Sequence, residues 1–181
     1  MIQKPEPSEY NPFYEPYISR INEQDLVTTL KTQLDTVVEF FGSLTEAQAN
    51  YKYAEGKWTI KEVLNHLNDT ERVFAYRALN IARGDQQELP GMDQDVYQDN
   101  SRTEGRSMSS LIDEFKAIRL STIALIEPLT AEDSMRSAVA SGSLVTVRAL
   151  VAMTAGHYIH HIAVVKSKYL SCLLLTRIEN T

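Results

Sequence analysis

The sequence predicts an all-α protein, a four-helix bundle with a long crossover between its second and third helices. Three observations support this fold class. Four stretches repeat apolar residues at a spacing of three or four, which is the period of an amphipathic helix. No stretch shows the strict alternation that is typical of a half-buried strand. The segment 84–105, which joins the second and third stretches, is too long for a tight helical hairpin.

An N-terminal arm, residues 1–20, precedes the first helix and is rich in proline. Its aromatic residues are Tyr10, Phe13, Tyr14 and Tyr17. We expect these rings to pack along the bundle or against a second subunit, with a frayed tail as the alternative. The first helix then runs from about Asn22 to Phe41. Its apolar positions are Leu26, Leu30, Leu34, Val37, Val38 and Phe41.

The second helix has a well-defined start. Thr59 and Glu62 have the spacing of a capping box, in which each side chain satisfies a free backbone N–H of the first turn. Trp58 and Val63 occupy the two positions of a hydrophobic staple. Gly84 marks the end of this helix, because glycine readily adopts the left-handed conformation that follows a last helical turn.

The third and fourth helices complete the bundle. The third is stopped or bent by Pro128 and carries Met108, Leu111, Ile112, Phe115, Ile118, Thr122, Leu125 and Ile126. The fourth follows Ser-Gly-Ser at 141–143 and runs from about Leu144 to Leu170. We predict one domain over residues 1–181, with the arm at 1–20 and the bundle at 21–172.

Composition and charge exclude several classes of partner. The formal net charge of −6 argues against binding to DNA or RNA, which depends largely on clustered Lys and Arg. No apolar run approaches the length of a membrane span, and the proline-rich start lacks the apolar core of a secretory signal. Cys172 is the only cysteine, so no disulfide can form within the chain, and we expect a cytoplasmic protein.

Three of the four histidines lie within five residues, in AGHYIHHIAVV. His157 and His161 are four apart and therefore share one helix face, which lets both imidazoles reach one metal ion. The residues in register with them are apolar, so this face points inward. His160 could replace His161 as a ligand. Its own face, however, carries the small residues Gly156 and Ala163, which are more typical of a close helix contact.

The fourth histidine, His66 in NHLNDTE, lies on the inward face of the second helix. With His157 and His161 it would give three nitrogen ligands and an open position for substrate, as in catalytic metal sites. Imidazole accepts Zn, Ni and Fe(II) about equally, so the sequence predicts a divalent metal without choosing among them. The alternative is that these histidines are hydrogen-bonded residues of the core.

Other metal chemistries lack their signatures. A zinc protease would show His-Glu-x-x-His, but Tyr158 follows His157, and the paired Glu-x-x-His motifs of di-iron bundles are absent. Four acidic residues between 93 and 104 fit a calcium-loop template, yet Gln98 replaces the required glycine. We interpret that segment as a solvated loop bordering the metal pocket, and Cys172 as a packing residue.

Four segments together resemble the DinB/YfiT-like superfamily of metalloenzymes: WTIKEVLNHLNDTERVF, LPGMDQDVY, SLIDEFKAIRLSTIALIEPL and AGHYIHHIAVVKSKYL. This resemblance implies a four-helix bundle with a long crossover, a homodimer, and one divalent metal held by a histidine triad. By position the triad falls on His66, His157 and His161. His160 and Tyr158 are then candidate neighbours of the ligands, although many relatives carry Glu where Tyr158 stands.

The resemblance also implies an activity, because characterised members include thiol-dependent S-transferases and an isomerase that use low-molecular-weight thiols. A metal lowers the pKa of a coordinated thiol, so transfer of a small thiol to an electrophilic small molecule is the first functional hypothesis. A metal-dependent hydrolase is the second. Asp69 or Glu71 could then act as base, although their spacing from His66 favours a solvated face. The third is a non-catalytic metal-binding or stress-associated scaffold.

Overall fold

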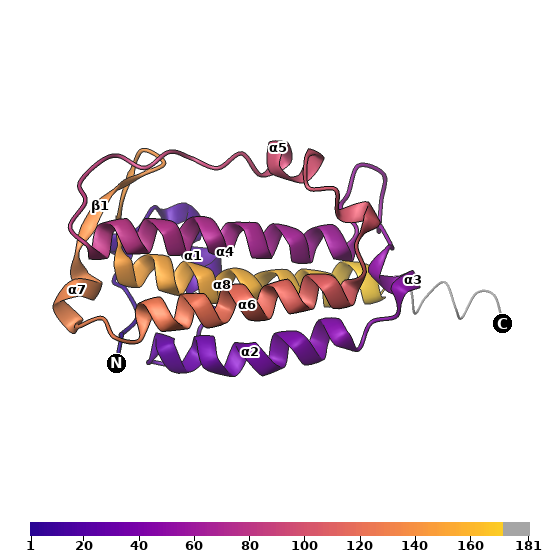
Figure 1. Ribbon diagram of the computed structural model, residues 1–181, viewed down its shortest axis with the longest axis horizontal. Helices are drawn as coiled ribbons and strands as arrows, with labels where there is room; N and C mark the ends of the chain where they lie inside the picture. Colours follow the sequence, from indigo (N-terminus) through magenta and orange to yellow (C-terminus); the bar gives the residue numbers. More distant parts are fainter. Residues whose placement is uncertain (172–181) are drawn as a thin grey trace.

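The computed structural model describes residues 1–171, and its four long helices form a bundle (Figure 1). They are α2 (Leu26–Gly42), α4 (Ile60–Ala82), α6 (Met108–Ile126) and α8 (Val147–Val164). The predicted all-α bundle is confirmed. The shorter elements are α1 (Glu15–Ile18), α3 (Glu46–Ala49), α5 (Gln94–Asp99), α7 (Ala131–Met135), a π-helical end at Val165–Leu170 and 3-10 turns at Pro7–Glu9, Pro12–Tyr14 and Thr103–Gly105. Cys172 lies outside the described residues.

The start and end of α4 follow the sequence signals. Thr59 Oγ1 accepts a hydrogen bond from the Glu62 amide at 3.1 Å, and Glu62 Oε2 accepts one from the Thr59 amide at 2.5 Å. The predicted capping box is therefore confirmed. Gly84 follows the last turn with φ +84°, in the left-handed region that favours glycine.

A short β-hairpin, which was not predicted from the sequence, accompanies the bundle. β1 (Ser137–Ala140) pairs antiparallel with β2 (Ser143–Thr146). Ser141 and Gly142 connect them, both at positive φ, which is the backbone of the two-residue turns preferred in hairpins. Four-residue strands are too short for alternation to be recognised in the sequence. As a result, α8 begins after β2 rather than at about Leu144.

The crossover makes α6 run parallel to α4. The chain leaves α4 near β1, returns over the bundle through α5, and enters α6 at the end where α4 began (Figure 1). The contacts agree with this direction. Asn68 donates a hydrogen bond to the Leu111 carbonyl at 3.1 Å, and further along both helices Glu71 contacts Arg119. The predicted crossover between the second and third long helices is confirmed.

A buried polar network joins all four long helices. Arg119 of α6 donates to Glu71 of α4 at 2.8 and 3.0 Å, and to the Leu30 carbonyl and Gln33 Oε1 of α2 at 3.2 and 2.8 Å. Gln33 in turn donates to the Ala155 carbonyl of α8 at 2.8 Å. The side chains of Arg119 and Glu71 are both 0% exposed. The solvated position expected for Glu71 was therefore wrong.

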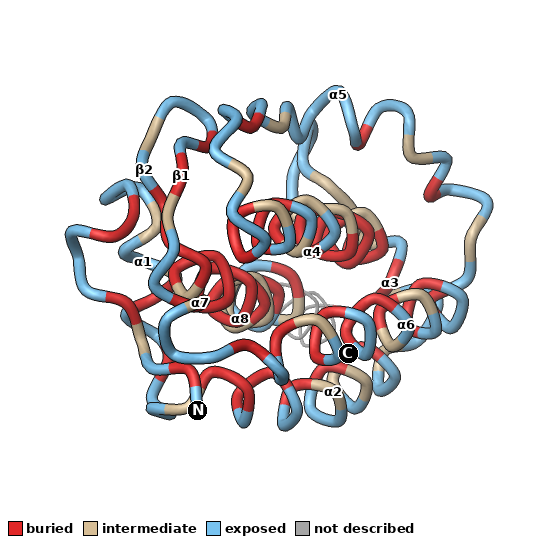
Figure 2. The backbone as a smooth tube through the Cα atoms, turned by 60° about the vertical axis from the view of Figure 1, so that its left-hand side comes forward, coloured by how far each residue is buried: buried red, intermediate tan, exposed pale blue. Residues whose placement is uncertain are grey.

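This network separates two apolar clusters of the core. One contains Leu30, Phe74, Ile123 and Met153, and the other contains Val37, Leu67, Phe115 and Tyr158. On each of α2, α4 and α6, the residue that joins the network lies, along the sequence, between a residue of one cluster and a residue of the other. The buried faces of the four helices turn toward one another in Figure 2. The network thus sets the register of the helices at mid-bundle, where apolar packing alone specifies register less strictly.

The N-terminal arm packs along the bundle, as one of the sequence alternatives predicted. Glu9 accepts hydrogen bonds from Arg148 and from Thr146, and α1 lies against α8. At Gly156 the approach is so close that a Cβ atom would lie 2.3 Å from the carbonyl oxygen of Tyr17. The close contact expected on the helix face of Gly156 is confirmed, and its partner is the arm.

Replacing Gly156 by alanine is expected to push the arm away from α8. Overpacking costs about 1–3 kcal/mol, so Tm should fall by several degrees, and amide hydrogen exchange at residues 12–18 should rise. Gly42→Ala is the matched control. Its Cβ would meet only Ile112 at 3.9 Å, so it should leave Tm unchanged or raise it slightly. Unchanged exchange in the arm of Gly156→Ala would contradict the packing described above.

Candidate metal centre

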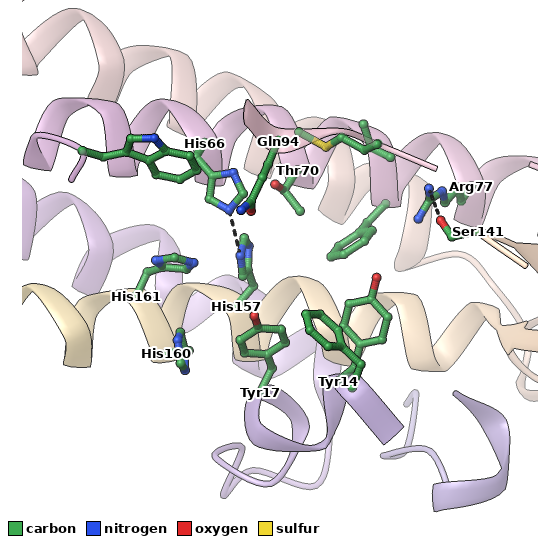
Figure 3. A pocket seen from close by; sticks show the side chains of 15 residues that line it. Tyr14, Tyr17, His66, Thr70, Arg77, Gln94, Ser141, His157, His160 and His161 are labelled. Atoms are coloured by element: carbon green, nitrogen blue, oxygen red, sulfur yellow. Dashed lines mark hydrogen bonds between the residues drawn. The ribbon is translucent and has the colours of Figure 1, made fainter. Parts of the chain in front are cut away.

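His66, His157 and His161 converge between α4 and α8. One ring nitrogen from each lies within 4.8 Å of the other two. The Nε2 atoms of His66 and His157 are 3.2 Å apart. His157 and His161 follow each other by one helical turn, and their ring centroids are 4.5 Å apart. Figure 3 shows His66 pointing down from α4 toward the two rings carried by α8.

Burial keeps these imidazoles neutral. It lowers the pKa of His66 to about 4. Burial and, to a smaller extent, the neighbouring histidines lower the pKa of His161 to about 3, and that of His157 falls well below its usual value for the same reasons. A neutral imidazole has a free lone pair on one nitrogen, which is the form that binds metals.

The donor set fits a single divalent ion. Two nitrogens bound at 2.0–2.1 Å to one tetrahedral ion stand about 3.4 Å apart, close to the 3.2 Å between His66 and His157. The three rings approach edge to face, with centroids 4.5–5.2 Å apart. No acidic side chain belongs to the cluster within residues 1–171. An all-imidazole set of this kind suits Zn, Ni or Fe(II) and disfavours Ca or Mg.

The structure places the two candidate neighbours differently. His160 borders the same pocket, with its ring 4.8 Å from that of Tyr17 and 5.2 Å from that of His161. It does not join the three-nitrogen cluster. Tyr158 is buried on another face of α8, where its hydroxyl donates to Asn68 at 3.2 Å and its ring lies under Arg119. Tyr158 therefore serves the core of the bundle.

The two acidic residues considered as bases are engaged elsewhere. Glu71 is held by Arg119 in the buried network. Asp69 accepts hydrogen bonds from Asn65 and Arg72, and burial raises its pKa. Neither residue lines the pocket at the histidines.

A pocket of about 480 Å³ opens in front of the cluster. Its walls are formed by the arm with Tyr14 and Tyr17, by α4 and the Trp58 that precedes it, by the crossover with Met92 and Gln94, and by the turn of the hairpin at Ser141. The histidines of α8 line its floor. The crossover borders the pocket as expected, although residues 94–99 form a short helix rather than a loop. Among the described residues of the lining there is no carboxylate and no lysine.

Two polar residues of this pocket, Thr70 and Arg77, were not predicted from the sequence. Both lie on α4 in the same stripe as His66, at i+4 and i+11, so helical spacing could have found them. The contributions of Ser141 and the arm could not be found in this way. They depend on the hairpin and on the path of the arm over α8.

The family model of the DinB superfamily matches residues 29–165, which is more than half of the chain. The chain belongs to the DinB superfamily. No match was found among curated proteins. Among solved structures, the fold of this DinB-superfamily chain is similar to that of YfiT from Bacillus subtilis, with a TM-score of 0.63 and 20% identity. The similarity covers 88% of this chain and 87% of that one.

YfiT is described as a probable metal-dependent hydrolase with an unusual four-helix bundle topology. At 20% identity the likeness establishes the fold that the two chains share. Within the described part of this DinB-superfamily chain, no helix is both long and apolar enough to cross a membrane.

Proposed function

We propose that this protein is a metal-dependent enzyme acting on a small molecule, with His66, His157 and His161 holding one divalent ion. The observation that carries the proposal is the convergence of three neutral imidazoles on the floor of a pocket of about 480 Å³. Membership of the DinB superfamily and the description of YfiT as a probable metal-dependent hydrolase support it. A divalent ion held there would supply a Lewis acid that favours the deprotonated form of a thiol or a water.

The chain's own residues shape the rest of the site. Trp58 packs 5.0 Å from the ring of His66, and Tyr17 packs 5.3 Å from the ring of His157. Phe74 extends this aromatic wall away from the histidines. These rings exclude water from the sides of the cluster and offer apolar contact to a substrate.

Transfer of a small thiol is the first candidate reaction. The described lining of the pocket holds no carboxylate that could serve as a general base for water. A free thiol has a pKa of about 8.5 and ionises near neutral pH without a strong base, whereas water does not. In the transfer, the thiol sulfur forms a bond to the electrophilic carbon, the leaving group departs with its electron pair, and the thiol proton is released.

Metal-dependent hydrolysis is the second candidate, favoured by the similarity to YfiT. Two parallel assays separate the candidates. Protein loaded with Zn, Ni or Fe(II) is offered cysteine, glutathione or bacillithiol with an aryl halide, and separately offered esters, amides and lactones without thiol. Conjugation that disappears after chelation is the expected result. Turnover only in the second assay would replace transfer by hydrolysis, and metal uptake without turnover would favour the non-catalytic scaffold.

The homodimer and the cytoplasmic location stay predictions.

A further inference from the structure

Arg77 is a buried cation at the end of the pocket opposite the histidines. Only 4% of its surface is exposed. Among residues 1–171 no carboxylate lies within the 4.0 Å that would make an ion pair with it, whereas the buried Arg119 is paired with Glu71. An unpaired buried charge is costly, and Lys or Arg residues are rarely buried in this way without a partner. The missing counter-ion is therefore a feature to explain.

The guanidinium has only neutral partners in the described residues. Its Nη2 atom donates to the Pro90 carbonyl at 2.6 Å and to Ser141 Oγ at 2.9 Å, and its Cζ lies 6.0 Å from the ring centroid of Phe74. Burial lowers the pKa of Arg77, and the nearby Tyr14 hydroxyl partly opposes this effect. Figure 3 shows Arg77 and Ser141 together at one side of the pocket and the histidines at the other.

Thr70 provides a second unsatisfied group between these two ends. Thr70 is 6% exposed and lines the same pocket, and its Oγ1 has no hydrogen-bond partner among the described residues. Buried hydroxyls are normally hydrogen-bonded, so this unsatisfied hydroxyl beside the pocket is a second feature to explain. His66, Thr70 and Arg77 lie along one face of α4, and Arg77 stands eleven positions after His66, a rise of about 16 Å along the helix.

We propose that the substrate of this pocket is an elongated small molecule with an anionic group, a carboxylate or a phosphate, that pairs with Arg77. Its apolar middle packs on Tyr14 and Phe74, and its reacting end reaches the histidines. This inference rests on the proposed function and adds the substrate class to it. Arginine suits the role, because its planar guanidinium forms paired, charge-assisted hydrogen bonds to carboxylate and phosphate.

A purely structural role is the competing explanation, since Arg77 connects α4 to the crossover at Pro90 and to the hairpin at Ser141. A brace between two neutral oxygens needs a donor but no positive charge. The two explanations differ in one measurable quantity, which is the ratio of affinities for an anionic probe and its neutral isostere. A brace affects both affinities alike, whereas an anion anchor changes the ratio.

The test uses 4-phenylbutyrate and 4-phenylbutanamide with full-length protein freed of metal by chelation. Trp58 is the only tryptophan and lines the pocket, so its fluorescence reports binding directly. The wild type is expected to bind the carboxylate roughly 10- to 100-fold more tightly than the amide. In Arg77→Met this ratio should fall to about 1 with amide binding retained, and Arg77→Lys should keep part of the preference.

Arg72→Met is the matched control, because Arg72 lies on the same helix, is half-exposed and does not line this pocket. It should leave the ratio unchanged. Three results would overturn the proposal. The wild type could bind the two probes equally, Arg77→Met could leave the ratio of affinities unchanged, or Arg77→Met could weaken the binding of both probes by the same factor. If Arg77→Met does not fold, Arg77→Gln takes its place, because it keeps a donor for Pro90 and Ser141 without the charge.

The experiment also separates this inference from the proposed function. It requires no metal, so loss of the ratio in Arg77→Met supports the anion anchor whether or not the histidines take up an ion. If instead the ratio survives in Arg77→Met and falls in His157→Ala, the carboxylate is bound at the histidines, and the role of Arg77 is refuted. Metal uptake by the wild type is scored independently by elemental analysis.

Discussion

His157→Ala is expected to abolish stoichiometric metal binding and to reduce thiol conjugation at least about 100-fold. Loss of a residue that only orients a ligand already costs 10- to 100-fold in metal affinity, so loss of a ligand at the centre of the cluster should cost more. His157 is the ring that both His66 and His161 approach most closely, at centroid distances of 4.9 and 4.5 Å. Elemental analysis of untagged protein and the conjugation assay measure the two losses.

A thermal shift gives a third readout of the same change. An ion present at 100 times its Kd stabilises the folded state by about 2.7 kcal/mol, so metal should raise the Tm of the wild type by several degrees. That increase should vanish in His157→Ala, whose helical circular dichroism should be retained. His66→Ala is expected to behave in the same way.

His160→Ala is the control for this prediction. His160 borders the same pocket but stands outside the three-nitrogen cluster, so this variant should still bind about one ion per chain. It also tests the choice of His161 over His160 that helical spacing left open. Metal loss in His160→Ala with retention in His161→Ala would reassign the third ligand. Full metal binding in His157→Ala would exclude the triad.

Arg119→Met is expected to destabilise the fold by about 3–5 kcal/mol, which lowers Tm by roughly 10–15 °C for a chain of this size. The substitution leaves the Glu71 carboxylate buried without a partner. It also removes the donor from the Leu30 carbonyl and from Gln33 Oε1. Denaturant unfolding followed by circular dichroism gives the free energy of unfolding.

Two further variants identify the cause of that loss. Lys116→Met changes a half-exposed ion pair on the same helix and should shift Tm by no more than about 2 °C. The double variant Glu71→Leu/Arg119→Met should recover much of the stability, because an apolar pair avoids the buried unpaired charge. Recovery should be incomplete, since the acceptors on α2 still lack a donor. A loss in Arg119→Met no larger than that in Lys116→Met would contradict the network.

Local sequence signals predicted most of the helical fold. Leu26, Leu30, Val37 and Phe41 repeat at helical spacing in α2, and Thr59 and Glu62 begin α4 by hydrogen bonds within four residues. The pairing of His157 with His161 is equally local, because the pitch of the helix brings residues four apart onto one face. These predictions needed no knowledge of the rest of the chain.

Elements that depend on distant contacts were not predicted. β1 and β2 are too short to show a pattern of their own, and Leu89 of the crossover contributes backbone hydrogen bonds to Val139 and Ser141 that hold the hairpin in place. The burial of Glu71 is another example. Its position on α4 was assigned to a solvated face, but Arg119 from α6 supplies the charge that allows it to be buried.

The sequence by itself therefore determined the four long helices, the crossover and the three histidines that face inward, because each follows from spacing along one chain segment. Only the tertiary structure decided how the pocket is completed. The arm reaches it through the close contact at Gly156, and Arg77 meets the hairpin at Ser141 across 64 residues of chain. Such contacts are set by the packing of whole elements, and no short-range pattern of residue types specifies them.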